Sequence, residues 1–389
     1  MKTASTPAGA ETPAGIYLHI PFCIQKCRYC DFYSVADRRL WSAFIPALIA
    51  EITGHSNDIG PVDTLYIGGG TPSVLPISDL TKLIDTVAAT FSLSPGTEIT
   101  IEVNPGTVTR DHMTAYRRAG VNRLNIGVQS FRDETLQFLG RCHTAKDAAQ
   151  AIDWARAAEF DNFGLDLIYG IPDQTRDTWR EEMHQALAFK PAHLSCYMLS
   201  FEPGTPLEKS RTEGGVRPLP DDRVSDLFLF TDEHLTRAGY EHYEISNFSL
   251  GKRYRSRHNQ KYWCHAPYLG FGPAAHSFLP PVRRWNVKNV QDYIKAPNSG
   301  KPPESETETL SREQLMIEAI YLGLRQSDGI DPGVFETRFG TPFTGMFSRV
   351  LAELTEEGML RMRENRCALT RNGMLYLDGI AARFAERIS

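Results

Sequence analysis

The stretch Tyr17-Leu-His-Ile-Pro-Phe-Cys23-Ile-Gln-Lys-Cys27-Arg-Tyr-Cys30-Asp-Phe directly follows the first predicted strand of the chain. Its Cys-x3-Cys-x2-Cys spacing lets one loop place three thiolates around an iron–sulfur cubane, because thiolates are the usual ligands of such clusters. No fourth protein ligand stands nearby, so one iron is left for an exogenous group. The amine and carboxylate of an amino acid could chelate that iron. The sequence therefore predicts a [4Fe–4S] cluster held by Cys23, Cys27 and Cys30.

A zinc site is the alternative for these cysteines, since structural zinc normally takes four protein ligands. Its fourth ligand would have to come from a distance, from His19 or Cys264. The spacing, with the aromatic Tyr29 before the last cysteine, favours the cluster. The chain has 7 cysteines, an odd number, and their crowding is unlike a secreted disulfide framework. The four outside the motif are most simply small buried apolar residues: Cys142, Cys196, Cys264 and Cys367.

The composition is that of an ordinary globular protein, with 41% hydrophobic and 23% charged residues. A net charge of -5 provides no basic field, which argues against a nucleic-acid partner. No apolar run approaches the roughly 20 residues that a membrane crossing needs. The first residues are small and polar without the apolar core of a secretory signal. We therefore expect a cytoplasmic protein whose residues 1–14 form a disordered tail.

Short β-branched runs alternate with amphipathic segments from about residue 16 to residue 200. The predicted strands are residues 16–19, 64–67, 98–103, 123–128, 162–168 and 193–198. The predicted helices between them are residues 41–54, 77–90, 110–119, 144–157 and 177–188. Six βα units in a row predict an α/β fold with a parallel sheet and right-handed crossovers, either open or closed into a barrel.

The pattern changes after residue 200, where Pro/Gly-rich loops, a helix over 221–238 and a loop-rich stretch extend the core, which we place at 15–295. Residues 296–308 are predicted to be a linker, because they contain three prolines and a glycine. Helices over 310–324 and 344–356, a hairpin of 360–362 with 367–370, and a last helix predict a small winged-helix-like α+β domain over 309–389. DNA binding by this domain is disfavoured, since residues 310–389 hold ten Arg and no Lys against eleven acidic residues.

The cysteine motif resembles the signature of the radical-SAM superfamily, and its Tyr-x-His-Ile-Pro-Phe-Cys context resembles the coproporphyrinogen dehydrogenase branch. The resemblance covers nearly the whole chain. It implies a partial (β/α)6 barrel. It also implies that the one cluster iron without a protein ligand binds S-adenosylmethionine (SAM). Reductive C–S cleavage to a 5′-deoxyadenosyl radical is the chemistry of that cofactor rather than of the protein.

Further motifs recur where barrel chemistry gathers, at the carboxyl ends of the strands. Gly68-Gly69-Gly70-Thr71 follows the second strand, and glycines let backbone approach a ligand closely. The resemblance implies SAM contacts at Gly69, Gly70 and Thr71. Glu102 ends the third strand, where its carboxylate could accept hydrogen bonds from ribose hydroxyls or the SAM ammonium. A plain tight turn and a surface acid are the structural alternatives for these two motifs.

The resemblance adds five more SAM-binding positions: Tyr17, Tyr29, Gln129, Arg141 and Asp166. Some of these serve a second SAM molecule in the dehydrogenase branch, so one or two bound SAM molecules are both open. Arg141 and Asp166 could instead form a structural ion pair.

Two details separate the branches of the family. Phe32 stands two positions after Cys30, where the dehydrogenase has a fourth cysteine. The motif His258-Asn-x-x-Tyr262-Trp263 resembles one implicated in haem binding by the haem chaperones of the HemW family. Imidazole is a common axial ligand of haem iron, and Tyr and Trp offer flat apolar surface. Three neighbours in sequence compete as iron ligands: Cys264, His265 and His276.

The resemblance therefore implies a haem chaperone rather than an oxidising enzyme. It would carry haem as cargo to acceptor haemoproteins, with the cluster and SAM needed for or regulating transfer. The implied partners are haem-accepting membrane respiratory enzymes, which could bring the chain to the membrane, and an electron donor, with a homodimer left open. The alternative is a catalytic radical-SAM enzyme that acts on a tetrapyrrole, by decarboxylating coproporphyrinogen III or modifying haem.

Overall fold

The computed structural model describes residues 12–297 and 303–388, and its first half is a run of alternating strands and helices. The strands are β1 (Ala14–Ile20), β2 (Val62–Gly69), β3 (Leu93–Val103), β4 (Arg123–Gln129), β5 (Phe163–Tyr169) and β6 (His193–Met198). The helices are α1 (Trp41–Gly54), α2 (Ile77–Thr90), α3 (Arg110–Arg118), α4 (Asp133–Leu139), α5 (Ala145–Ala157) and α6 (Arg176–Ala188).

Shorter elements make up the second half. They are α7 (Pro206–Thr212), α8 (Asp221–Arg237), β7 (Glu241–His242), β8 (Asn247–Ser249), α9 (Arg257–Trp263), β9 (Tyr268–Phe271), β10 (His276–Leu279), β11 (Val282–Asn286), α10 (Val290–Lys295) and β12 (Glu304–Thr309). The C-terminal unit holds α11 (Arg312–Arg325), α12 (Pro332–Phe339), α13 (Phe343–Met346), α14 (Ser348–Glu356), β13 (Leu360–Arg363), β14 (Arg366–Leu369), α15 (Arg371–Met374) and α16 (Leu377–Ala385).

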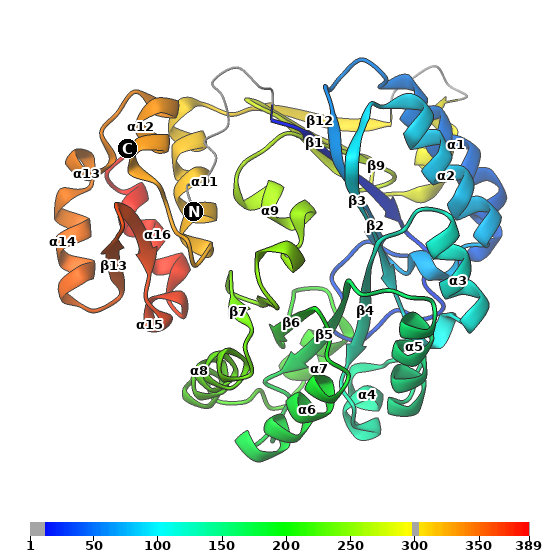
Figure 1. The fold of residues 1–389 in the computed structure, drawn as a ribbon, viewed down its shortest axis with the longest axis horizontal. Helices are drawn as coiled ribbons and strands as arrows, with labels where there is room; N and C mark the ends of the chain where they lie inside the picture. The colour runs from blue at the N-terminus through cyan, green and yellow to red at the C-terminus, as the bar shows by residue number, and fades with distance from the viewer. Residues whose placement is uncertain (1–11, 298–302, 389) are drawn as a thin grey trace.

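Twelve strands of the described residues form one sheet in the order β12-β11-β10-β9-β1-β2-β3-β4-β5-β6-β8-β7. The six strands β1 to β6 run parallel and lie in chain order, so each unit is added on the same side, as in a barrel. The barrel does not close, because β9 pairs with the outer edge of β1 and β8 with the outer edge of β6. Figure 1 shows helices α1, α2, α3 and α5 along the outer side of this open curve. The predicted partial barrel is confirmed.

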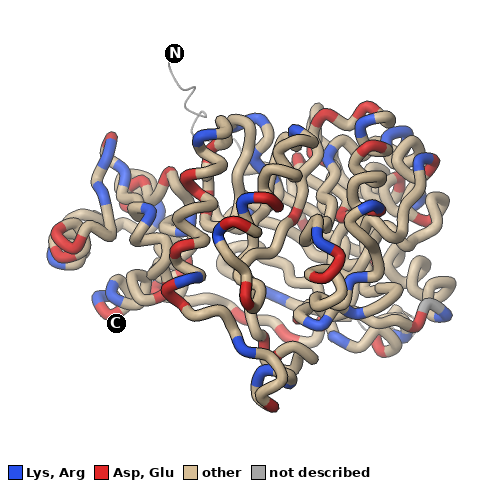
Figure 2. The backbone as a smooth tube through the Cα atoms, turned by 90° about the horizontal axis from the view of Figure 1, so that it is seen from below, with Lys and Arg blue, Asp and Glu red and all other residues tan. Residues whose placement is uncertain are grey.

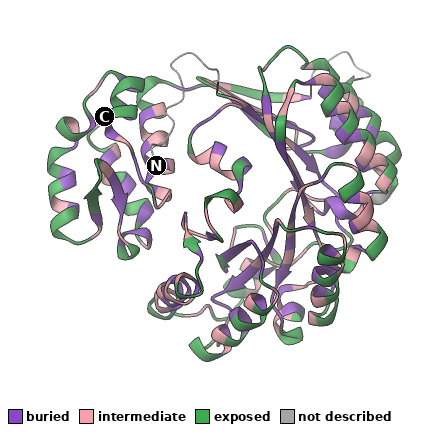
Figure 3. Cartoon of the chain, in the orientation of Figure 1, coloured by how far each residue is buried: buried purple, intermediate pink, exposed green. Residues whose placement is uncertain are grey.

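The apolar strands explain why this sheet forms the core. Ile16, Leu18 and Ile20 of β1 have no exposed surface, and Leu65 and Ile67 of β2 are equally buried. These residues lie at alternate positions, so one face of each strand is apolar and packs into the core. Figure 3 shows buried residues along the strands and exposed ones on the outer faces of the helices. All six predicted strands and all five predicted helices of this half are present, with bounds shifted by a few residues.

Capping residues determine where three of the covering helices begin. Thr109, Thr144 and Thr175 each accept a hydrogen bond from the backbone N–H three residues on, within a reciprocal capping box. Such a box satisfies N–H groups that the first turn of a helix leaves without partners. The loops that lead from the strands to these helices are therefore ordered, which keeps the strand ends in place.

The predicted linker, residues 296–308, includes a strand that the sequence did not indicate. Residues 304–309 form β12, an edge strand that pairs antiparallel with β11, where Arg284 and Arg283 form ion pairs with Glu304 and Glu308. The strand is mostly exposed and strongly charged, so its alternation of Glu with Ser and Thr lacked the apolar signal of a strand. Residues 298–302 lie outside the described part of the chain, as do residues 1–11 of the predicted tail, whereas Ala14 already belongs to β1.

The C-terminal unit contains the predicted hairpin, in which β13 and β14 pair antiparallel. The predicted helix over 344–356 is divided into α13 and α14 at Phe347, whose fully buried ring packs against Phe343. Figure 2 shows Lys and Arg interspersed with Asp and Glu along the backbone. In the part of the chain that the structure describes, no helix is long and apolar enough for a membrane crossing. The division of the chain into a core, a linker and a winged-helix-like domain stays a prediction.

Candidate functional site

The loop after β1 carries the three motif cysteines and is held from several sides. The backbone N–H of Cys23 donates to the carbonyl of Val35 (3.0 Å), which closes the loop. The N–H of Arg28 donates to the carbonyl of Leu139 at the end of α4 (3.1 Å), and the N–H of Leu207 in α7 donates to the carbonyl of Arg28 (2.9 Å). The loop is therefore docked onto two helices that follow other strands of the barrel.

Polar donors are directed at two of the three thiols. The hydroxyl of Thr71 donates to Sγ of Cys23 at 3.4 Å, and Nη1 of Arg141 donates to Sγ of Cys27 at 3.3 Å. Burial raises the pKa of the Cys30 thiol to about 11, with smaller contributions from the nearby Cys27 and Cys23. Hydrogen bonds to sulfur are a feature of iron–sulfur sites, where they tune the cluster. The donor set around these thiols therefore fits a thiolate-bound cluster.

The zinc alternative for this loop needs a fourth ligand from outside it. Across residues 12–297 and 303–388, no three His, Cys, Asp or Glu side chains are arranged to hold one ion. The distant ligands of the zinc alternative are also engaged elsewhere. His19 uses Nδ1 with the hydroxyl of Tyr17 (3.0 Å) and Nε2 with the carbonyl of Tyr33 (2.9 Å), and Cys264 lies beside Gln326 at the end of α9.

The glycines after β2 fit tightly against the cysteine loop. Gly69 has a φ of +108°, and a Cβ there would lie 2.6 Å from Nδ1 of His19. A Cβ on Gly70 would lie 2.8 Å from the carbonyl oxygen of Phe22. The N–H groups of Gly70 and Thr71 donate to carbonyls of Ile20 and Phe22, both at 2.8 Å. These glycines are therefore required where β2 and the cysteine loop meet, and Thr71 is positioned beside Cys23.

Two half-buried carboxyl groups face the interior of the barrel. Glu102 accepts hydrogen bonds from the hydroxyl of Tyr66 (2.8 Å) and the N–H of Gly69 (3.1 Å), and Asp166 accepts from Asn125 (2.7 Å). Burial raises the pKa of Glu102 to about 7 and that of Asp166 to about 6. A pKa raised this far by desolvation is typical of groups that meet a charged ligand or a proton. Glu102 is thus no surface acid.

Two further predicted SAM contacts come at or after the end of the fourth strand: Gln129 ends β4, and Arg141 follows α4. Nη2 of Arg141 donates to the carbonyl of Gly127 (2.9 Å), and no ion pair with Asp166 forms among the described residues. Gln129 is buried with a φ of +65°, a strained conformation for a residue with a Cβ. Tyr29 is buried beside Arg141, and burial raises its pKa above the usual value. The structural ion pair considered for Arg141 and Asp166 is therefore absent, and both side chains remain candidate ligand contacts.

The predicted haem residue His258 lies inside the barrel rather than at its surface. Its Nδ1 lies 2.9 Å from the hydroxyl of Thr64, its Nε2 lies 2.9 Å from the hydroxyl of Tyr262, and its ring is 1% exposed. The ring stacks on Tyr66 with centroids 5.2 Å apart, and Tyr17 lies 6.4 Å away. Burial lowers the pKa of His258 to about 3, so the imidazole is neutral. Both ring nitrogens of His258 therefore have hydrogen-bond partners in this structure, and its assignment as a haem ligand stays a prediction.

Comparison with known proteins agrees with this geometry. The model of the radical SAM superfamily matches residues 17–186, and that of the HemN C-terminal domain matches residues 310–376. The chain is 35% identical to the heme chaperone HemW of Synechocystis sp. over 370 residues, 90% of this chain and 86% of that protein. It is 33% identical to the heme chaperone HemW of Bacillus subtilis, over 95% of this chain and 98% of that protein. The chain belongs to the HemW family.

The fold of this HemW-family chain is shared with coproporphyrinogen III oxidase (HemN) from Escherichia coli, with a TM-score of 0.82. The alignment covers 96% of this chain and 90% of that one at 24% identity, so the likeness concerns the fold alone. The radical SAM match implies a [4Fe–4S] cluster and SAM. The docked cysteine loop, Glu102 and Arg141 are what this HemW-family chain offers to those two groups.

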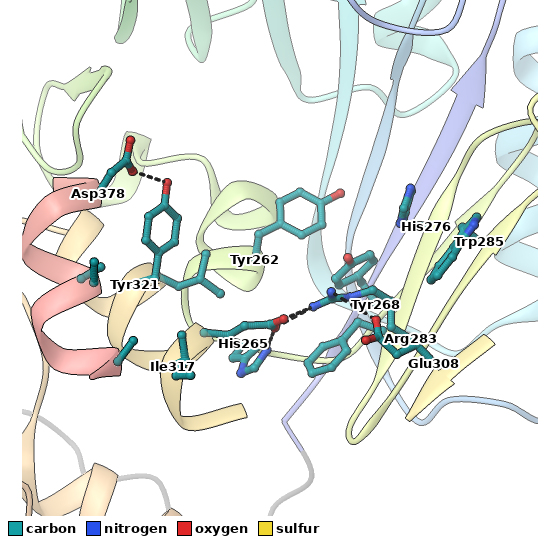
Figure 4. A pocket seen from close by; sticks show the side chains of 16 residues that line it. Tyr262, His265, Tyr268, His276, Arg283, Trp285, Glu308, Ile317, Tyr321 and Asp378 are labelled. Atoms are coloured by element: carbon teal, nitrogen blue, oxygen red, sulfur yellow. Dashed lines mark hydrogen bonds and ion pairs between the residues drawn. The ribbon is translucent and has the colours of Figure 1, made fainter. Parts of the chain in front are cut away.

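A cavity of about 870 Å³ lies outside the barrel interior, between β9 to β11 and helices α11 and α16. Figure 4 shows Tyr262 and Tyr268 at this cavity, together with His265 and His276, two competing ligands named above. Trp263 lies elsewhere, against Tyr243 and the guanidinium of Arg325. Of the three predicted haem residues of this HemW-family chain, Tyr262 lines this cavity and His258 and Trp263 do not.

Sequence reasoning missed Thr64 and Tyr66, which join the two predicted sites. Tyr66 contacts Glu102 and stacks on His258, while Thr64 is the second hydrogen-bond partner of that histidine. Both residues lie on β2, two positions apart, and so point to the same face of the strand. Polar side chains at alternate positions of an otherwise apolar strand were the available signal.

Proposed function

We propose that this chain is a haem chaperone: it binds haem and transfers it to acceptor haemoproteins, and a [4Fe–4S] cluster and SAM are needed for the transfer or regulate it. Membership of the HemW family, whose relatives are named heme chaperones, carries this proposal. The geometry supports it through a docked three-cysteine loop with polar donors at its thiols.

The proposed cluster ligands are Cys23, Cys27 and Cys30. The proposed SAM contacts are Tyr17, Tyr29, Gly69, Gly70, Thr71, Glu102, Gln129, Arg141 and Asp166. When bound, the cluster and SAM supply one-electron chemistry at a sulfonium. The chain's own residues orient these groups and exclude water from them. Arg141 holds a positive charge beside Cys27, and Glu102 presents a desolvated carboxyl group.

The residue two positions beyond the last cysteine favours a carrier over the porphyrinogen reaction. Phe32 is 66% exposed and carries no group that ligates a metal or transfers a proton. Decarboxylation of coproporphyrinogen III would have to proceed without the fourth cysteine expected from the dehydrogenase branch. The proposal therefore assigns no catalytic residue.

The proposed partners follow from the proposed function. They are haem, haem-accepting proteins such as membrane respiratory enzymes, and an electron donor for the cluster. A second copy of the chain is a further partner to test by the oligomeric state in solution. The proposed location is the cytoplasm, with contact to the membrane made through the acceptors.

The test begins with anaerobic reconstitution of the cluster in the full chain. The loaded protein is incubated with haem or with coproporphyrinogen III, each with SAM and a reductant, and then with an apo-acceptor. Stoichiometric haem retention and transfer, with both tetrapyrroles unchanged, is the expected result. Protoporphyrinogen formation, or loss of the haem Soret band into a ring-opened product, would overturn the chaperone proposal in favour of a tetrapyrrole-modifying enzyme.

The hydroxyl of Thr71 provides a test of the cluster site. Thr71→Val keeps the shape of this buried side chain but removes the donor to Sγ of Cys23. Hydrogen bonds to cluster sulfurs favour the reduced, more negative state. One such bond is worth about 1 kcal/mol, so we expect the reduction potential to fall by about 40 mV, measured by redox titration with EPR. Ser73→Ala, which alters a neighbouring hydroxyl bonded to Thr107, is the control, and an equal shift there would contradict the assignment.

Glu102 provides a test of the SAM site through pH. Its folded pKa of about 7 lies above the ordinary value, so the empty protein keeps the proton between pH 4.5 and 7 and loses stability as pH rises through that window. A cationic ligand favours the ionised carboxylate. The SAM affinity of the wild type relative to Glu102→Gln should therefore rise about tenfold from pH 6 to pH 8 in equilibrium titrations. A pH-independent ratio, equal to that of the exposed Glu134→Gln control, would remove Glu102 from the site.

A further inference from the structure

The strand β12 forms one edge of the large sheet. Within the described residues it pairs with β11 alone, so its backbone N–H and C=O groups that point away from β11 have no strand partner. Most of β12 is also exposed. An exposed sheet edge is a template on which a further strand can be added. The backbone of β12 can therefore accept an extended segment of another chain.

The side chains of β12 carry negative charge on the face that borders the cavity between β9 to β11 and helices α11 and α16. Glu306 lies opposite Trp285 in the register with β11, and Trp285 lines the cavity. Glu308 lies opposite Arg283, and both of them line the cavity. Arg283 lies 2.6 Å from Glu318 but 3.9 Å from Glu308. No ion pair engages the exposed Glu306 within the described residues, so this face of the edge keeps unpaired negative charge.

The cavity of about 870 Å³ adds aromatic rings and another carboxylate to this acidic face. Trp285 of the sheet and Tyr321 of α11 line it from opposite sides (Figure 4). Asp378 of α16 accepts a hydrogen bond from Tyr321 at 3.1 Å and has no ion pair in the part of the chain that the structure describes. Aromatic faces attract the cations of Lys and Arg, and carboxylates pair with them. The cavity beside β12 therefore suits basic side chains with long apolar stems.

The charge of this edge decides which strand can be added to it. A second copy of the chain, paired through β12, would bring Glu306 and Glu308 of both copies onto neighbouring strands, where like charges are destabilising. A segment with Lys or Arg at alternate positions would instead place cations beside these carboxylates while its backbone extends the sheet. Membrane proteins carry an excess of Lys and Arg in their cytoplasmic loops. The charge therefore favours a basic segment of a membrane acceptor over a second copy.

We propose that β12 and the adjoining cavity form a docking surface for an extended segment, rich in Lys and Arg, of an acceptor haemoprotein. This inference rests on the proposed function, which supplies the acceptor as the partner. The segment adds a strand at β12, and its basic side chains lie beside Glu306 and Glu308. Those that reach the cavity meet Trp285 and Asp378. The association is non-covalent, and it weakens as salt screens the charges.

The test measures how a fluorescein-labelled peptide of alternating Lys and Val binds to the full, reconstituted chain, by fluorescence anisotropy. A double variant, Glu306→Gln with Glu308→Gln, removes both charges, and we expect it to bind the peptide about fivefold more weakly. Glu304→Gln is the matched control and should bind like the wild type, because Glu304 pairs with Arg284 on the opposite face of the same strand. The same peptide with N-methyl groups on alternate amides keeps its charge but cannot extend the sheet, and it should bind the wild type at least about tenfold more weakly.

The outcomes separate the docking surface, its partner and the proposed function. Equal binding of the peptide by the double variant, or equal binding of the N-methylated peptide, would overturn the docking surface. The peptide comparison uses the unchanged chain, so it decides even where a variant folds poorly.

Haem transfer then tests the partner. We expect the double variant to retain haem like the wild type but to transfer it to a scarce apo-acceptor about fivefold more slowly. An unchanged transfer rate, with weakened peptide binding, would overturn the acceptor as the partner. A wild-type chain that binds the peptide but retains no haem would overturn the proposed function, and with it the acceptor, but not the docking surface.

Discussion

Replacing Cys30 by alanine should leave the reconstituted chain with almost no iron, against about four iron atoms per wild-type chain, and without the visible absorbance of a cluster. Three thiolates hold the proposed cubane, so the loss of one of them leaves a second iron without a protein ligand. Cys196 and Cys367 are buried, and burial raises the pKa of Cys196 above its usual value. The measurement is iron content with absorption and EPR spectra after anaerobic reconstitution.

Cys142 provides the matched control for this substitution. It is exposed and follows Arg141, whose guanidinium contacts Cys27, so it is the cysteine outside the motif that lies near the loop. We expect Cys142→Ala to keep the full cluster. Loss of iron in Cys142→Ala with retention in Cys30→Ala would move the third ligand from Cys30 to Cys142. Cys30 is only partly buried in a loop. The free energy of unfolding of the Cys30→Ala apo-protein should therefore stay within about 0.5 kcal/mol of the wild-type value.

The barrel strands were predictable from sequence because both faces of each strand are covered. Within residues 64–67, the fully buried Leu65 and Ile67 must be apolar to fill that environment, and the following glycines end the run. The strands β9 to β12 were not predictable in the same way. They span only four to six residues each, and β12 is exposed and charged, so that their pairing depends on neighbours far away in the chain.

The candidate site was likewise predictable from sequence only where it depends on local spacing. Spacing within one loop is a local property, so Cys23, Cys27 and Cys30 could be named from sequence. Their hydrogen-bond partners Thr71 and Arg141 could be named by resemblance, but their contacts with Cys23 and Cys27 could not. Burial is a property of the whole fold.

His258 shows what this difference means for a motif. Beside Tyr262 and Trp263 it resembled a ligand at a flat apolar surface. The fold instead places it under β1 and β2, where a Cβ on Gly15 would lie 3.2 Å from its ring. The motif also carries a fold constraint that sequence could not reveal: the backbone N–H of His258 donates to Glu98 (3.1 Å), which fixes the start of α9 against the sheet.

The substitution His258→Ala should therefore destabilise the chain by about 2–4 kcal/mol, because it empties a buried space and removes the partners of Thr64 and Tyr262. Packing contacts are lost around the empty space, and each of the two hydroxyls is left in the interior without its hydrogen-bond partner. Urea unfolding of the apo-chain measures the loss. His276→Ala is the matched control, since it removes an exposed imidazole and should change the free energy of unfolding by less than about 0.5 kcal/mol.

Haem titration of the His258→Ala chain tests the ligand role that the motif suggests. At a temperature where the variant stays folded, we expect His258→Ala to bind haem within about threefold of the wild type, because both ring nitrogens of His258 are engaged by Thr64 and Tyr262. A His258→Ala chain of wild-type stability that fails to bind haem would restore the ligand role that the motif suggested. It would also require α9 to leave β2 when haem arrives, because only then would Nε2 be free of Tyr262. Hydrogen exchange of α9 with and without haem would detect such a movement, and we expect none.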